Sequence, residues 1–309
     1  MNHTGANPQT IQNKTAVAII PARFGSSRLP GKPLLEITGK PMICWVVERA
    51  LAARNVARAI VATDDQLIVY AVKSAGYEAV MTRGSHASGS DRLAEVAAHL
   101  EAAEIIVNVQ GDEPLIAPFT IETAIDTLIQ ESFLQRRKRA KDEEGETGGG
   151  GDAETGADIV TTWEPIETAA DVLNPDVVKV VVSENDDAVY FSRAPVPFPR
   201  DAVMKNGSIE AALANEPSLV TQFRKHTGLY VYRRSVLLEF ASWPQSKLER
   251  TEALEQLRAL EHGVKIKVIK ARAPSIGVDT PEDLERVRAI VEKGGFEFRV
   301  SSFELAGPR

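Results

Sequence analysis

The sequence predicts an α/β protein with a mainly parallel sheet and helices on both faces. Two short apolar runs, 16–20 and 105–109, have the length and the β-branched content of buried strands. Segments with helical periodicity alternate with such strands from the start of the chain. This alternation favours parallel strands joined by helical crossovers.

In the N-terminal half, prolines and glycines mark the ends of several expected elements. Pro41 suits the first turn of a helix with one broad apolar face, and Gly76 suits the end of the next helix. The stretch between the first strand and Pro41 is rich in Gly, Ser and Pro, which predicts a loop. The expected elements are a strand over 16–20, a loop over 21–33, a helix from Pro41, a strand over 58–63, a helix over 66–75, a strand over 79–81, a helix over 90–103 and a strand over 105–109.

The C-terminal half resumes the alternation after an interruption. A helix over about 120–134 leads into a basic block, an acidic block and four glycines, which predicts a flexible, solvated insertion over 136–157 rather than a nucleic-acid patch. A Pro-rich stretch and a poorly patterned segment indicate a smaller lobe over about 184–245, or an exchanged arm. The last helix begins after Thr280, with Pro281 at its first position and Asp283 three residues after the cap. The other expected elements are strands over 158–162, 177–182, 188–191, 228–232 and 265–269 and a helix over 248–262.

The composition excludes several classes of protein. The 309 residues include 36 Lys and Arg and 43 Asp and Glu, and the net charge of −7 argues against a general nucleic-acid binder. No apolar run approaches the roughly 18 residues of a membrane span, and residues 1–14 lack the apolar core of a secretory signal, so we expect a cytoplasmic protein. The single Cys44 excludes an internal disulfide framework and a multi-cysteine zinc site. We expect one unit over 15–293, between a flexible tail over 1–14 and a C-terminal extension over 294–309.

The loop after the first strand concentrates positive charge. It carries three cations, Arg23, Arg28 and Lys32, and in open α/β sheets ligands bind at the carboxyl edge where such loops lie. Loop N–H groups and clustered cations suit a polyphosphate. The loop matches neither a Walker motif, because Pro33 stands where Ser or Thr is required, nor a dinucleotide fingerprint. A rigid phosphate-binding loop is favoured over an incidental exposed turn.

Two acidic residues suggest a metal site. Asp112 follows an apolar strand, and Mg²⁺ is held by one or two carboxylates together with substrate phosphates. Asp112 could equally do no more than cap its turn. Asp279 lies beside the N-terminus of the last helix. The hypothesis of a shared metal site requires that Asp279 lie close to Asp112 in space.

Three further residues have the chemistry of ligand recognition. Arg193 could grip a carboxylate through two hydrogen bonds, and His226 could donate to a hydroxyl or a carboxylate. The polar loop around His86 could read a base or could simply be a loop. Each of these residues, taken singly, is more often structural, and the five histidines show no metal-ligand spacing.

Several segments together carry a family resemblance. The sequence closely resembles the CMP-Kdo synthetases, the 3-deoxy-manno-octulosonate (Kdo) cytidylyltransferases of lipopolysaccharide synthesis. The resemblance covers nearly the whole chain outside the tails and the insertion. The matching segments are IIPARFGSSRLPGKPL (19–34), IVATDD (60–65), MTRGSHASGSDRLAEV (81–96), IIVNVQGDEPLI (105–116), NPDVVKVV (174–181), YFSRAP (190–195), KHTGLYVYR (225–233), LEQLR (254–258) and GVDTPEDLERV (277–287).

The resemblance implies a Rossmann-like fold of the nucleotide-diphospho-sugar transferase type, with a smaller lobe used in a homodimer. It implies a reaction of CTP with Kdo that gives CMP-Kdo and pyrophosphate with the help of Mg²⁺, and no membrane or nucleic-acid partner. By position, the catalytic residues would be Arg23, Lys32, Asp112 and Asp279, of which Asp112 and Asp279 would bind Mg²⁺. Nucleotide contacts would come from Ala22, Arg23, Arg28, Lys32, Arg83 and Ser88, and sugar contacts from Gln110, Arg193, His226, Tyr230 and Glu255.

Two other functions compete with this one. A CMP-sialic acid synthetase, or another sugar nucleotidyltransferase, would share the core, but the segments SRLPGKPL, VNVQGDEP and GVDTPEDLERV together favour Kdo. A nucleotide-binding regulator would be expected to lose the metal acids or the phosphate cations, and all of them are present.

Overall fold

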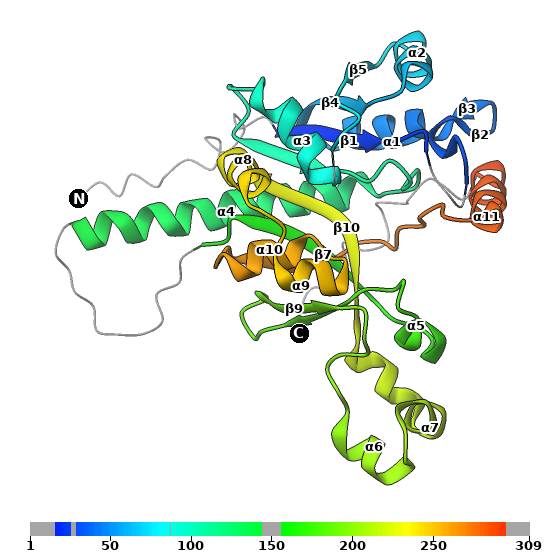
Figure 1. Ribbon diagram of the computed structural model, residues 1–309, viewed down its shortest axis with the longest axis vertical. Coiled ribbons are helices and arrows are strands. Elements are labelled where there is room, and N and C mark those ends of the chain that lie inside the picture. The colour runs from blue at the N-terminus through cyan, green and yellow to red at the C-terminus, as the bar shows by residue number, and fades with distance from the viewer. Residues whose placement is uncertain (1–15, 26–28, 87, 144–155, 295–309) are drawn as a thin grey trace, which may run out of the picture.

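The computed structural model describes residues 16–25, 29–86, 88–143 and 156–294 (Figure 1). The predicted α/β fold is confirmed. Seven strands form one path in the order β11-β7-β10-β6-β1-β4-β5, and within this path only β10 runs against its neighbours. The strands of the path are β1 Ala16–Ala22, β4 Val56–Thr63, β5 Glu78–Met81, β6 Ile105–Asn108, β7 Ile159–Pro165, β10 Arg224–Arg233 and β11 Ile266–Lys270.

Two shorter strands extend the sheet beside β10. Strand β8 (Lys179–Val182) pairs with β10 and with β9 (Ala188–Ser192), and β9 pairs with β8 alone. A separate ribbon of β2 (Glu36–Ile37) and β3 (Lys40–Pro41) precedes the first helix.

Helices cover both faces of the sheet, as the sequence predicted. Strand β1 is buried on both sides: Ala18 and Ile20 belong to one apolar cluster, and Val17 and Ile19 to another. Because successive side chains of a strand point to opposite faces, β1 needs the continuous apolar run that its sequence has. The first cluster is completed by α1 (Met42–Leu51), α2 (Gln66–Ser74) and α4 (Pro118–Glu143), the second by α3 (Gly89–Ala98), α8 (Arg234–Ser242) and α10 (Gln256–Glu261).

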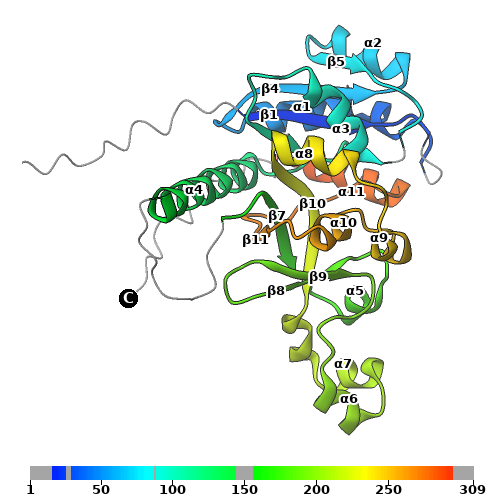
Figure 2. The ribbon, with the colours of Figure 1, turned by 60° about the vertical axis from the view of Figure 1, so that its left-hand side comes forward.

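A third apolar cluster lies away from the main sheet. It draws on residues from Ile166 to Phe223, including side chains of α5 (Ala169–Leu173), α7 (Ile209–Asn215) and η3 (Pro217–Gln222). Figures 1 and 2 both show α7 and the neighbouring α6 (Arg200–Asn206) projecting below the sheet. We expected a lobe over about 184–245, but α8 within that range packs on the main sheet through Leu237 and Phe240.

Several expected boundaries were wrong. Helix α4 continues to Glu143 rather than ending near Leu134, because the basic block consists of good helix formers and contains no Gly or Pro. Residues 144–155 of the expected insertion lie outside the described residues, and Ala157 is buried, its N–H bonded to Glu131. The segment before Arg224 is mostly helical, and α8 was not foreseen.

The expected helix over 248–262 is two helices. Helix α9 (Lys247–Glu252) ends where Ala253 adopts a left-handed conformation (φ +51°), and α10 begins at Gln256. The remaining helices are η2 (Lys32–Leu34) and α11 (Pro281–Glu292), and α11 has the predicted cap on Thr280. Every helix among the described residues is too short or too polar to cross a membrane.

Candidate active site

The ends of β1, β4 and β6 create one loop-lined edge. These strands are parallel neighbours, so the loops that follow Ala22 and Asn108 leave the sheet on the same side. The acidic turn touches the end of β1: a Cβ atom added to Gly111 would lie 2.7 Å from the carbonyl oxygen of Pro21, the residue before Ala22. The phosphate loop and the acidic turn predicted from the sequence therefore meet.

Lys32 joins the two acids proposed for metal binding. Its ammonium lies 2.7 Å from Asp112 Oδ2 and 3.0 Å from Asp279 Oδ1, and the Val278 N–H donates to the carbonyl of Asp112 at 2.9 Å. The condition that Asp279 meet Asp112 in space is thus fulfilled. Burial by itself would lower the pKa of Lys32, but the two carboxylates outweigh burial and raise it, so the ammonium stays charged.

Glycine 31 explains how Lys32 reaches this position. Gly31 has φ +68° and directly precedes η2, whose first residue is Lys32. A residue with a side chain adopts this left-handed conformation only at a cost, and glycine adopts it freely. We call Arg23, Lys32, Asp112 and Asp279 the charged corner.

The other nucleotide-site candidates lie on neighbouring loops. Arg23 is exposed and donates to the carbonyl of His86 at 3.2 Å, which ties the first loop to the segment over 83–88. Arg83 is exposed and paired with Glu95, whose carboxylate also contacts His86. Ser88 caps α3 through a capping box with Asp91. Arg28 lies outside the described residues, so the expected cluster of three cations is described only for Arg23 and Lys32.

The sugar-site candidates gather around β10, and we call them the β10 group: Gln110, Arg193, His226, Tyr230 and Glu255. The ring of His226 lies 5.3 Å from that of Tyr230 and 5.0 Å from that of Phe191, two residues before Arg193. Gln110 donates to the carbonyl of Gly228 at 3.2 Å. A Cβ on Gly228 would lie 2.6 Å from Gln110 Cγ, so only glycine leaves room for this side chain.

His226 is neutral and bonds to a threonine on the neighbouring strand. Burial lowers its pKa to about 3. Its Nε2 lies 2.9 Å from Thr161 Oγ1, and the Thr161 hydroxyl donates its one hydrogen to the carbonyl of Leu229 at 2.8 Å. Nε2 must therefore donate to Thr161, which leaves Nδ1 as an acceptor. His226 thus donates to one hydroxyl of the protein and keeps Nδ1 as an acceptor, and its expected role toward a ligand stays a prediction.

Glu255 and Tyr230 complete the buried part of the group. Ser90 donates to Glu255 Oε1 at 2.8 Å, whereas Oε2 is buried without a hydrogen-bond partner among the described residues. Burial is the main cause of the raised pKa of both Glu255 and Tyr230. An unpartnered buried oxygen is costly, so Oε2 is suited to accept a ligand hydroxyl.

The guanidinium of Arg193 is held by backbone carbonyls rather than by a carboxylate side chain. Its guanidinium donates to the carbonyls of Glu252 (2.7 Å), Pro175 (2.9 Å) and Ala253 (3.3 Å). A guanidinium has five N–H donors, so donors remain for a ligand carboxylate. Sequence reasoning missed Glu252 and Thr161, because neither stands in a motif that signals its distant partner.

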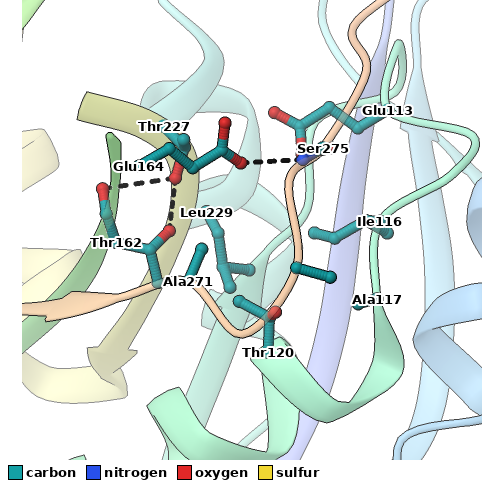
Figure 3. A pocket seen from close by; sticks show the side chains of 11 residues that line it. Glu113, Ile116, Ala117, Thr120, Thr162, Glu164, Thr227, Leu229, Ala271 and Ser275 are labelled. Atoms are coloured by element: carbon teal, nitrogen blue, oxygen red, sulfur yellow. Dashed lines mark hydrogen bonds between the residues drawn. The ribbon is translucent and has the colours of Figure 1, made fainter. Parts of the chain in front are cut away.

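A small cavity lies behind the acidic turn (Figure 3). Ser275 joins its two carboxylates: the hydroxyl donates to Glu113 at 3.0 Å, and the N–H donates to Glu164 at 2.7 Å. Burial, and then the neighbouring Asp112, raise the pKa of Glu113 to about 7. At about 10 Å³ the cavity has room for about one water and cannot hold a nucleotide. These contacts fasten the segment that leads to Asp279.

The described residues hold no cluster of three or more His, Cys, Asp or Glu side chains that could bind a metal. The pair of Asp112 and Asp279 would therefore need oxygen ligands from a substrate or from water. This requirement matches the way Mg²⁺ is bound in nucleotide sites.

Comparisons with known proteins identify the family of the chain. The family model for cytidylyltransferases matches residues 17–266. The 3-deoxy-manno-octulosonate cytidylyltransferase of Trichlorobacter lovleyi is 46% identical over 278 residues, covering 90% of this chain and 99% of the relative. That of Escherichia coli is 43% identical over 276 residues, covering 89% and 96%.

A solved structure is also similar. It is a CMP:2-keto-3-deoxy-manno-octonic acid synthetase complexed with CTP, 41% identical to this chain, with a TM-score of 0.71 and coverage of 91% of this chain and 99% of that one. From the family model and these relatives, the chain belongs to the cytidylyltransferase family, as one of the 3-deoxy-manno-octulosonate cytidylyltransferases.

Proposed function

We propose that the protein couples CTP with Kdo to form CMP-Kdo and pyrophosphate. The observation that carries this proposal is the meeting of Asp112 and Asp279 at Lys32, on the carboxyl edge of the sheet. The anomeric hydroxyl of Kdo would attack the α-phosphorus of CTP, form the new P–O bond and release pyrophosphate as the P–O bond to the β-phosphate breaks. Catalysis of such a displacement consists mostly of positioning and charge neutralisation.

The charged corner would bind Mg²⁺ and the triphosphate. Two carboxylate oxygens that already converge on one cation suit a hard divalent ion, and substrate oxygens would complete its coordination. Bound Mg²⁺ would supply charge neutralisation at the phosphates and acidify the attacking hydroxyl. Lys32 and Arg23, together with Arg28, would neutralise the phosphate oxygens, and Ala22, Arg83 and Ser88 would contact the nucleotide from the surrounding loops.

The β10 group would hold the sugar acid. The free donors of Arg193 would bind the carboxylate, because a planar guanidinium matches two carboxylate oxygens. His226 Nδ1, the ring nitrogen that faces away from Thr161 in this bonding, and Glu255 Oε2, which has no partner among the described residues, would each accept a sugar hydroxyl. Gln110 and Tyr230 would line the same site. These acceptors favour a polyhydroxylated acid.

A pyrophosphate-release assay tests the reaction. The purified protein would be given CTP, Mg²⁺ and one acid from a panel of Kdo, 8-amino-Kdo and sialic acid. Release with Kdo is expected. Release with sialic acid alone would replace the proposed substrate, and CTP binding without turnover of any acid would favour a regulatory protein. Chelation with EDTA should abolish turnover, and full activity in EDTA would remove the metal from the proposal.

We propose further that the protein is a cytoplasmic homodimer. CTP is a metabolite of the cytoplasm. The smaller lobe exposes Phe198 and Met204, and the edge strand β9 of the sheet exposes Val189; exposed large apolar side chains of this kind suit a subunit contact. Light scattering of the wild type and of the Phe198→Ser/Met204→Ser variant would test the dimer: a dimeric wild type and a monomeric variant are expected.

A further inference from the structure

We propose that Glu252 is the positioning residue for Arg193, which fixes the guanidinium that binds the carboxylate of the 2-keto sugar acid. Only the identity of this ligand rests on the proposed function. The positioning role rests on contacts between two segments that are far apart in the sequence. Strand β9 brings Arg193, and the end of α9 brings Glu252.

The Glu252 side chain fixes the backbone at Arg193. Its Oε2 accepts from the Arg193 N–H at 2.9 Å, and its Oε1 accepts from the Ser192 hydroxyl at 2.7 Å. The Tyr190 hydroxyl reaches the same Oε1 at 3.5 Å. One carboxylate thereby ties the end of β9 to the end of α9, through hydrogen bonds to a charged acceptor, which are stronger than neutral ones.

The backbone of the same helix end fixes the Arg193 side chain. Nε donates to the carbonyl of Glu252 at 2.7 Å and Nη2 to the carbonyl of Ala253 at 3.3 Å. In an uninterrupted helix these carbonyls would accept from N–H groups one turn further on. The left-handed turn at Ala253 ends the helix and leaves both carbonyls free to accept from Arg193. The break between α9 and α10 therefore positions the guanidinium.

The break also links the two ends of the sugar site. Glu255 stands three residues after Glu252, immediately before α10, and receives the Ser90 hydroxyl. One short segment, 252–255, therefore supplies both the hydrogen bonds to Arg193 and the position of Glu255. Three donors of the guanidinium are fixed by carbonyls, so the remaining two have a defined direction.

Glu252 also supplies negative charge where two cations approach each other. The side chain of Lys179 is buried, and its ammonium donates to the carbonyls of Asn174 (2.9 Å) and Val177 (2.5 Å). Arg193 donates to Pro175 in the same turn. Without Glu252, these two cations would face each other with carbonyl oxygens alone, and the position of Arg193 would be less defined.

A double-mutant comparison tests this role. Glu252→Ala removes both acceptors, and we expect the KM for Kdo to rise about tenfold while the KM for CTP changes less than about twofold. Glu252→Gln keeps one acceptor for the Arg193 N–H, and its amide can donate to Ser192, so its KM for Kdo should stay within about threefold of wild type. In an Arg193→Ala background, Glu252→Ala should have little further effect on the KM for Kdo, because the two residues act as one unit. Glu261→Ala, at an exposed position on α10, is the matched control.

Several results would overturn the positioning role. Equal increases in both KM values, additive effects with Arg193→Ala, or a Gln variant as impaired as the Ala variant would each do so. A crystal structure of Glu252→Ala tests the role without any substrate: we expect Arg193 to leave the carbonyls of Glu252 and Ala253, and an unmoved guanidinium would contradict the proposal. If the wild type fails to use Kdo, the proposed function fails, whereas the crystal structure still decides the role of Glu252.

Discussion

The charged corner and the β10 group lie at the same sheet but differ in exposure and in charge. In the charged corner, Asp112 and Asp279 are 35% and 53% exposed in their side chains, and one ammonium is shared between them. In the β10 group, Tyr230 is 5% exposed, His226 is kept neutral, and Glu255 has one oxygen that no described residue bonds. The first region holds charges that can exchange partners, and the second holds directed polar groups in a buried, aromatic setting.

This difference indicates how each region would recognise its ligand. Charges near solvent bind strongly only when a ligand brings several opposite charges, as a triphosphate with Mg²⁺ does. Buried donors and acceptors discriminate by geometry, because each unpaired group is costly. Substitutions in the charged corner should therefore mainly lower kcat, and substitutions in the β10 group should mainly raise the KM for the sugar.

The largest effect is expected for Asp112→Ala. Removing one of the two carboxylates that bond to Lys32 should lower kcat by about 10³-fold or more, which amounts to about 4 kcal/mol of transition-state stabilisation. Lys32 would keep Asp279 as a partner, so the fold should survive. The measurement is pyrophosphate release at saturating CTP and Kdo, with circular dichroism to confirm the fold.

Asp201→Ala is the control for Asp112→Ala, since the Asp201 side chain is 94% exposed in the smaller lobe. It should behave as wild type. If Asp112→Ala retained more than a tenth of wild-type kcat, Asp112 would not be a metal ligand. The proposed difference between the charged corner and the β10 group would then be wrong.

How far the sequence predicts each region follows from the range of the contacts. The charged corner depends on loops at the ends of neighbouring parallel strands, so Asp112 and Lys32 could be placed at one edge from the strand pattern alone. The capping box at Thr280 is also local, and it fixed the start of α11. The sequence could not predict that Asp279 lies close to Asp112. The position of Asp279 depends on an irregular segment, which Ser275 bonds to Glu113 and Glu164.

The β10 group was harder to predict because distant contacts override local pattern. Residues 248–262 have a continuous helical pattern, and the break at Ala253 coincides with the capture of two carbonyls by Arg193, about 60 positions earlier. The hydrogen-bonding role of His226 is set by Thr161 on a neighbouring strand. The residue types in this region were identified from the sequence, but their partners were not.

The glycine that precedes Asp112 of the charged corner should give the next largest effect. The Cβ of Gly111→Ala would lie 2.7 Å from the Pro21 carbonyl oxygen, a backbone atom that cannot turn aside. We expect a loss of about 2–3 kcal/mol in the free energy of unfolding, measured by urea denaturation. Gly89→Ala, whose Cβ would meet only Pro21 Cγ at 3.9 Å, should cost no stability. Equal stability of the two variants would show that the loops at this edge are not rigid.

The corresponding glycine within β10 should behave differently. The Cβ of Gly228→Ala would lie 2.6 Å from Cγ of Gln110, a flexible side chain that can rotate away. We expect a loss of about 1–2 kcal/mol in stability and a KM for Kdo that rises about three- to tenfold, since Gln110 would leave its bond to the Gly228 carbonyl. In a Gln110→Ala background the substitution should cost almost nothing. A full cost in that background would mean that the strain lies elsewhere.

The smallest effect, and the most direct test of a neutral sugar site, is the pH dependence contributed by His226. Its pKa in the folded protein is about 3, below the ordinary value of 6.5, so between these values the unfolded chain binds the extra proton. The free energy of unfolding must therefore fall as the pH drops below 6.5, and this contribution is absent above it. From pH 7 to pH 6 the loss from this group should be about 0.7 kcal/mol. His226→Gln keeps a donor for Thr161 and cannot titrate, so the difference in unfolding free energy between wild type and variant should shrink by this amount over that interval. A difference that stays constant with pH would mean that His226 titrates normally, and that the β10 group carries charge as the charged corner does.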